Sequence, residues 1–189
     1  MLKKLFTRKK EENIQKPTLE YDEEFKFLMC LTSERAKIIV NRCLDLGLEV
    51  NTQKLQKLMV LMQGKMLVDY DKPFFKEEIK ATKCGVMIPK VDQDFRRYAC
   101  GCDKKIIGYI CFLEREQEVM DSILSSYGHM DSFELRELLP LKALNSFCLK
   151  CEPFTAIPNS LIKKVFSDSD YAQELLDEIK NEEIYLKGK

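Results

Sequence analysis

Apolar residues recur at every third or fourth position in several parts of the chain, and this spacing places them along one face of an α-helix. The first such segment begins at Thr32 or Ser33, residue types that cap helix N-termini, and Gly47 is expected to end it. Its predicted apolar face consists of Ala36, Ile39, Val40, Cys43 and Leu44. The segment is therefore predicted to be an amphipathic helix with one buried face.

A second helix is predicted to begin at Asn51 or Thr52 and to end before Pro73. Its apolar stripe consists of Leu55, Leu58, Met59, Met62 and Met66. The polar side chains expected on the outward face are Gln53, Lys54, Gln56 and Lys57. Gly64 lies within this helix, where glycine costs about 1 kcal/mol relative to alanine, so we expect another segment to pack closely against it.

Further helices are predicted in the second half of the chain. One runs from about 113 to 127, and its helical stripe is apolar except for Glu116. Asp131 and Glu134 have the spacing of a capping box and begin the next helix, which Pro140 is expected to limit. The last predicted elements are at 159–167 and about 170–186.

Two segments lack a clean helical period. The segment from 76 to 91 contains Gly85 and Pro89, so we expect it to be irregular or partly extended, with a short helix from Asp92. Residues 106–111 suit either a strand or the first turn of a buried helix, and periodicity does not distinguish the two. The predicted fold class is therefore mainly α, a compact multi-helix domain with irregular or short extended segments near 75–91 and at 105–111.

Length and charge divide the chain into two predicted parts. Residues 1–20 are polar with a local excess of lysine and arginine, and they are interpreted as a basic N-terminal tail or peripheral helix. Residues 21–189 are predicted to form a single helical domain, because this length suits one sizeable core.

The charge balance argues against nucleic acid as the main partner. The chain has 31 basic and 31 acidic residues, whereas phosphate binding needs a basic excess on the binding face. No uninterrupted apolar run of about 18 residues occurs, so we expect no membrane span. The first residues lack the apolar core of a signal peptide, and we expect a cytoplasmic protein with reduced cysteines.

Side chains for catalysis or cofactor binding are few. The single histidine, His129, follows the glycine at 128, a position typical of a surface or capping residue. One imidazole gives little support to a histidine-rich metal site or a Ser-His-Asp triad. The seven glycines form neither a P-loop nor a dinucleotide fingerprint. We therefore expect no cofactor and no enzymatic activity.

Two close cysteine pairs leave one alternative open. Cys100 with Cys102 and Cys148 with Cys151 could together hold a structural zinc ion, as in a zinc-stabilised nucleic-acid-binding module. The first pair has one intervening residue instead of two, and neither pair is flanked by a glycine-rich knuckle. We favour reduced thiols and no metal.

A series of short motifs follows in order through the middle of the chain. The motifs are Lys-Leu-Gln-Lys-Leu at 54–58, Lys-Pro-Phe-Phe at 72–75, Ile-Lys-Ala at 79–81 and Gly-Val-Met-Ile-Pro at 85–89. This order resembles the Panacea domain of bacterial antitoxins, a family related to SocA-like antitoxins and to phage-associated proteins. The resemblance covers about residues 33–140, its specific part is 51–95, and a C-terminal helical extension follows.

The chain departs from the family pattern at three places. Thr82 stands where the family commonly has tryptophan, and Val86 stands where it commonly has proline. The Thr-His pair often found near the end of the domain is missing around 138–140. The chain is therefore interpreted as a divergent member.

The resemblance implies a protein partner. It predicts an antitoxin-like domain that neutralises a cognate toxin encoded nearby by direct contact, or that acts as an adaptor presenting the toxin to a protease. A phage- or mobile-element-encoded protein acting on a host factor is the alternative with the same fold.

The motif residues divide into two predicted roles. Those expected to build the fold are Leu55, Leu58, Gly64, Phe75, Ala81, Gly85 and Pro89. Gly85 is expected to permit a close backbone approach or a positive φ, and Pro89 to end its segment before the next helix. Those expected to contact the partner are the outward Gln53, Lys54, Gln56 and Lys57.

Overall fold

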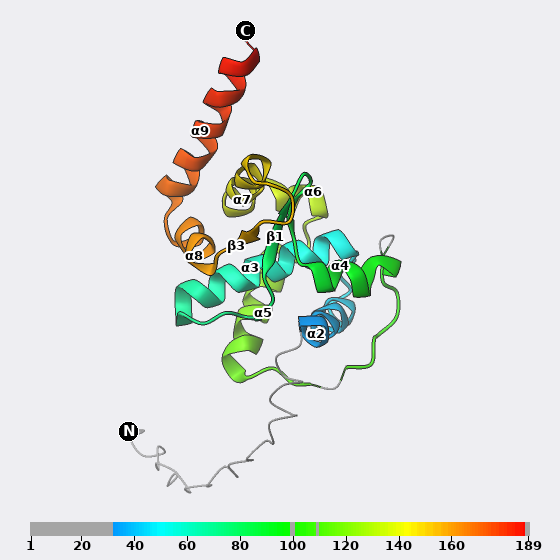
Figure 1. Cartoon of the computed structure of the whole chain (residues 1–189). Helices are drawn as coiled ribbons and strands as arrows, with labels where there is room; N and C mark the ends of the chain where they lie inside the picture. The colour runs from blue at the N-terminus through cyan, green and yellow to red at the C-terminus, as the bar shows by residue number, and fades with distance from the viewer. Residues whose placement is uncertain (1–31, 99–100, 109, 188–189) are drawn as a thin grey trace, which may run out of the picture.

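The computed structural model describes residues 32–98, 101–108 and 110–187, with side chains as far as Glu178 (Figure 1). The predicted tail at 1–20, the segment 21–31 and Cys100 lie outside the described residues. Helices predominate in the described part, and one small antiparallel sheet accompanies them. The predicted mainly α fold class is confirmed.

One end of each of the first two described helices agrees with the sequence prediction. α2 (Thr32–Asp45) ends in a turn at Gly47, whose φ of 68° is left-handed, and Leu48 N donates to Cys43 O at 2.8 Å. α3 (Thr52–Tyr70) is capped by Asn51, whose side-chain oxygen accepts a hydrogen bond from Lys54 N at 2.9 Å. Local sequence therefore fixes where α2 ends and where α3 begins.

α3 is the central helix of the molecule. It contacts α2, α5 (Glu114–Tyr127), α6 (Ser132–Glu137), α7 (Leu139–Lys150) and α8 (Asn159–Ser167), and in Figure 1 it crosses the middle of the fold. Most of its residues are buried, and they lie on nearly all sides of the helix. A helix surrounded in this way has no broad solvent face.

The predicted outward face of α3 is therefore partly wrong. Gln53 is exposed and Lys57 is half-buried, but Lys54 is only 6% exposed and Gln56 only 8% exposed. A polar side chain can be buried where a neighbouring segment offers a hydrogen-bond partner, and sequence periodicity does not reveal such partners.

The sheet consists of β1 (Ile79–Thr82), β2 (Gly85–Met87) and β3 (Ala156–Ile157) in the order β2-β1-β3. β1 and β2 form a hairpin with Thr82 opposite Gly85, and β3 pairs antiparallel on the other edge of β1. The expectation of a short extended segment within 75–91 is confirmed. Residues 105–108 and 110–111 are irregular.

Two predicted boundaries differ in the structure because proline is favourable in the first turn of a helix. The short helix α4 (Pro89–Phe95) begins at Pro89 and not at Asp92, and a 3₁₀ turn, η1 (Arg96–Tyr98), follows it. Pro140 lies in the first turn of α7, a helix that the sequence pattern did not predict. Pro140 therefore begins a helix as well as limiting the preceding one.

The C-terminal helices extend the core. α8 packs on α3, and the first half of α9 (Ser169–Lys187) packs on α7 with Ala172, Leu175 and Leu176 buried. Figure 1 shows the second half of α9 extending away from the rest of the structure. Buried apolar side chains from Ala36 to Leu176 form one continuous cluster. None of the described helices has the length and apolar character needed to cross a membrane.

Candidate partner-binding surface and the network beneath it

The first turn of α3 uses its polar side chains to hold neighbouring segments. Thr52 Oγ1 donates to Phe95 O at the end of α4, at 2.5 Å. Lys54 Nζ donates to Gly128 O, at the C-terminal end of α5, at 2.7 Å. A cation beside the last carbonyl groups of a helix also stabilises the helix dipole. Lys54 is therefore a buried cap for α5 in this structure.

Gln56 contacts the start of α4 in the same way. Its Oε1 accepts a hydrogen bond from Ile88 N at 2.9 Å, and its Nε2 lies 3.5 Å from Asp92 Oδ1. Ile88 immediately precedes Pro89, and it is fully buried. Gln56 thus fixes the point at which the hairpin ends and α4 begins.

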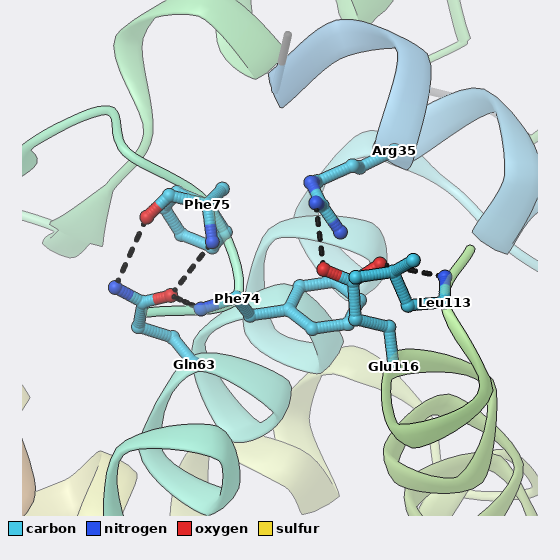
Figure 2. A network of polar contacts seen from close by, with 6 residues as sticks. All are labelled: Arg35, Gln63, Phe74, Phe75, Leu113 and Glu116. Atoms are coloured by element: carbon cyan, nitrogen blue, oxygen red, sulfur yellow. Dashed lines mark hydrogen bonds and ion pairs between the residues drawn. The ribbon is translucent and has the colours of Figure 1, made fainter. Parts of the chain in front are cut away.

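Gln63, two turns further along α3, holds the chain before the hairpin (Figure 2). Its Oε1 accepts hydrogen bonds from Phe74 N at 2.7 Å and Phe75 N at 3.0 Å. Its Nε2 donates to Phe75 O at 3.3 Å and to Asn159 Oδ1 at 3.0 Å. Because Gln63 is 1% exposed, one amide side chain replaces water for three buried backbone groups.

A buried ion pair lies on the other side of Phe74 (Figure 2). Arg35 Nη2 of α2 is 2.8 Å from Glu116 Oε1 of α5, and the side chains are 8% and 7% exposed. Glu116 Oε2 also accepts a hydrogen bond from Leu113 N at 2.9 Å, which caps α5. Glu116 was the one polar residue on an apolar stripe, and this was the sequence signal for the pair.

Aromatic rings surround the Arg35 guanidinium. Its Cζ lies 5.1 Å from the centroid of the Phe74 ring and 5.4 Å from that of Phe112, and the two rings pack edge to face at 5.3 Å. Arg35 Nε and Nη1 are buried and have no hydrogen-bond partner among the described residues. The ring faces therefore supply the attraction that hydrogen bonds would otherwise give these two nitrogens.

The motif residues that were expected to build the fold lie in its interior or at its tight contacts. Leu55, Leu58, Phe75 and Ala81 are at most 2% exposed. A Cβ at Gly64 would lie 2.3 Å from the Phe166 ring of α8, so the expected close packing at Gly64 is present. Gly85 has a φ of 110°, and a Cβ there would lie 2.2 Å from Asn145 Oδ1. Both features expected of Gly85 are present.

Both departures from the family pattern in the hairpin have a structural use. Thr82 Oγ1 donates to Gly85 O at 2.8 Å and accepts a hydrogen bond from Cys84 N at 3.2 Å, which closes the hairpin turn. Val86 N donates to Asn145 Oδ1 at 3.1 Å, a bond that proline could not make. The hairpin is therefore tied to α7 through a backbone N–H group that proline at this position would remove.

The cysteines do not form a metal site within the described residues. No group of three or more histidine, cysteine, aspartate or glutamate side chains there is arranged to hold a metal ion. Cys102 Sγ donates to Lys104 O at 3.2 Å, and Cys151 Sγ donates to Phe147 O at 3.4 Å. Cys148 is buried, and burial raises the pKa of its thiol to about 12. Cys100, the fourth predicted ligand, lies outside this part of the chain.

His129 is exposed and lies in an open groove of about 980 Å³. The first turn of α3, the end of α5 and the start of α6 line this groove, and Phe133 lies at the α6 side of it with 74% of its surface exposed. The position of His129 beside a helix end agrees with its interpretation as a surface or capping residue.

An outer surface remains where α3 meets α6. Gln53 and Lys57 lie one turn apart on α3, and Phe133 and Arg136 lie one turn apart on α6. Burial, and then the nearby charge of Arg136, lower the pKa of the Lys57 ammonium. Lys57 and Arg136 are therefore neighbours, although they are far apart in sequence. Sequence reasoning missed Phe133 and Arg136, because a six-residue helix has too short a pattern to show which residues face solvent.

Comparison with known proteins agrees with the motif order. Residues 55–142 match the family model described as "Antitoxin SocA-like, Panacea domain". No curated protein and no solved structure matches the chain. The matched residues contain the Gln56 and Gln63 contacts, the hairpin, the Glu116 cap and α6. The predicted resemblance is therefore confirmed: residues 55–142 are similar to the antitoxin SocA-like Panacea domain.

Proposed function

We propose that this protein is an antitoxin that neutralises a cognate toxin by direct contact. The match of residues 55–142 to an antitoxin-like domain carries the proposal. The geometry supports binding, because the motif side chains hold the hairpin, α4 and α5 rigidly around α3. A rigid scaffold presents a surface without a large entropic cost of ordering on association.

The contact surface is proposed to include the outer side of α3 and α6. Of the four predicted contact residues, Gln53 and Lys57 are available for it, whereas Lys54 and Gln56 are used within the fold. Exposed Phe133 adds an aromatic side chain to the same surface, and aromatic residues are enriched at protein interfaces. The proposal therefore shifts the predicted site toward α6.

To test the proposal, the neighbouring reading frame is expressed alone and together with this protein. Growth arrest by the neighbour alone, and its relief on co-expression, are the expected results. Co-purification of the two proteins in a stable complex tests direct contact. A neighbour that is harmless alone, or that stays toxic in the presence of this protein, would overturn the proposal.

Two further arms sharpen the test. Repeating the co-expression in cells lacking their ATP-dependent proteases separates neutralisation by contact, which persists, from an adaptor mechanism, which fails. A Gln53→Ala, Lys57→Ala variant is expected to weaken neutralisation while keeping the helical circular dichroism spectrum. Lys72→Ala, after the far end of α3, is the matched control and should neutralise normally.

A further inference from the structure

A small basic hollow lies beside the tip of the hairpin, where the β1–β2 turn meets α6 and α7. In Figure 1 the hairpin tip lies next to both helices; the hairpin strands contact α7, and α6 contacts α7. The hollow has a volume of about 140 Å³. The lining side chains used below are Lys83, Arg136, Glu137, Lys142, Asn145 and Leu149.

Hydrogen-bond donors dominate this hollow. Lys83 and Arg136 are exposed, and neither forms an ion pair with another described residue. The one carboxylate, Glu137, is already paired with Lys142, at 2.5 Å between Oε2 and Nζ. Asn145 uses its oxygen to accept from Val86 N, and its Nδ2 group has no partner among the described residues. The hollow therefore has donors and positive charge in excess, and its single anionic group is occupied.

The positive surface continues onto α3. Arg136 lies close enough to Lys57 for its charge to lower the pKa of that ammonium, after the larger effect of burial. Two like charges this close repel each other in the free protein, although Arg136 also interacts with the Glu137 carboxylate, whose main partner is Lys142. An anionic group placed on this surface would relieve that repulsion as well as gain its own attraction.

One exposed apolar side chain lines the hollow, and another lies on the same short helix as Arg136. Leu149 forms part of its wall and is 59% exposed, and Phe133, one turn from Arg136 on α6, is 74% exposed. A cationic centre with apolar flanks is complementary to a protein segment that alternates acidic and apolar residues. A sugar-phosphate backbone would leave Leu149 and Phe133 without apolar partners.

We propose that Lys83, Arg136 and Lys57 bind an acidic segment of a protein partner, with a carboxylate in the hollow and apolar partner side chains against Leu149 and Phe133. This inference rests on the proposed function in that the partner is the toxin. The chain has 31 basic and 31 acidic residues, so the protein as a whole has no general attraction for anions. Attraction of an acidic segment would therefore come from the local excess of positive charge at this surface.

The test uses the full chain and a fluorescein-labelled peptide of alternating Glu, Asp, Leu and Phe. Fluorescence anisotropy should show binding that weakens as salt is added. Lys83→Glu with Arg136→Glu should weaken this binding by about tenfold or more. The matched control is Lys72→Glu with Lys104→Glu, which makes the same change in net charge at exposed sites outside the hollow and should bind as the wild type does.

Several results would overturn the inference. They are no binding at millimolar peptide, equal loss in both double variants, or tighter binding of duplex DNA than of the peptide through the same residues. A toxin that Lys83→Glu, Arg136→Glu still binds and neutralises normally would also overturn it. If only the proposed antitoxin function is wrong, the result is different: the wild type would bind the peptide at the hollow and yet neutralise no neighbouring gene product.

Discussion

Gln56 and Gln63 show how single polar residues organise this fold. They lie two turns apart on α3, and each accepts hydrogen bonds from backbone N–H groups of the chain between α3 and α4. Where this segment turns, its backbone N–H groups have no hydrogen-bond partner in a helix or strand. The buried N–H groups therefore need side-chain acceptors. The glutamine in the Lys-Leu-Gln-Lys-Leu motif is therefore explained by the hydrogen bond that it accepts from a buried backbone N–H group, and not by a role on the protein surface.

Replacing Gln63 with methionine keeps the size of the side chain and removes its acceptor. Phe74 N and Phe75 N would then be buried without partners, and we expect a loss of about 3 kcal/mol in the free energy of unfolding. Urea denaturation measures the loss. Gln53→Met on the exposed side of the same helix is the control and should change stability by no more than about 0.5 kcal/mol. Equal effects at the two positions would contradict the role given to Gln63.

The buried thiols make the stability depend on pH in the alkaline range. Burial raises the pKa of Cys43 to about 11 and that of Cys148 to about 12. A raised pKa in the folded state means that the stabilisation is complete below the ordinary thiol pKa and is lost as the pH rises through the folded value. We expect the free energy of unfolding to fall between about pH 9 and pH 12, and to fall less in Cys43→Ala.

Alkylation supplies an independent measurement of the same thiols. Iodoacetamide reacts with thiolates, so the exposed Cys84 and Cys111 should be modified in the native protein before Cys43 and Cys148. Peptide mass mapping gives the order of modification. Rapid native labelling of Cys43 would show that its thiol is not protected as the structure indicates.

Two pairs of elements contact each other at a glycine, where the absence of a side chain leaves room for the neighbouring element. α8 approaches α3 at Gly64, where the Phe166 ring occupies the space of a Cβ. The hairpin approaches α7 at Gly85, where Asn145 does the same and φ is positive. These glycines weaken their own elements locally, and the tertiary contacts that they allow compensate for this.

Gly64→Ala sets helix propensity against packing. Alanine would favour the helix by about 1 kcal/mol, but its methyl group would overlap the Phe166 ring, so we expect net destabilisation of about 1–3 kcal/mol. In a Phe166→Ala background the overlap is absent, and the same change should become neutral or stabilising. A double-mutant cycle in urea measures this reversal, and an additive result would contradict the contact.

At the scale of the whole molecule, the core is larger than the family match. The match covers 55–142, but the continuous apolar cluster also contains Ala36, Ile39 and Val40 from α2, and Ala172 and Leu176 from α9. Arg35, which pairs with Glu116, also lies before the matched residues. The boundary of a domain in sequence comparison need not be the boundary of the unit that folds.

A fragment of residues 55–142 is therefore expected not to fold alone. It would lack α2, α8, α9 and the whole of β3, and it would leave the Glu116 carboxylate without Arg35. Loss of dispersion in its nuclear magnetic resonance spectrum, with the full chain as the reference, is the measurement. A cooperatively folded fragment would show that the flanking helices are dispensable additions.

The sequence by itself determined the mainly α class, the capping residues of α3 and α6, the family motif and the close contact at Gly64, because these depend on local periodicity, caps and glycine positions. Only the tertiary structure decided which polar residues of α3 face inward, that Pro140 begins a helix, and that Lys83 and Arg136 line the same hollow. Burial and charge proximity depend on segments far apart in the chain. Helical periodicity identifies a buried face, but the hydrogen-bond partners that allow a lysine or glutamine to join it come from other elements.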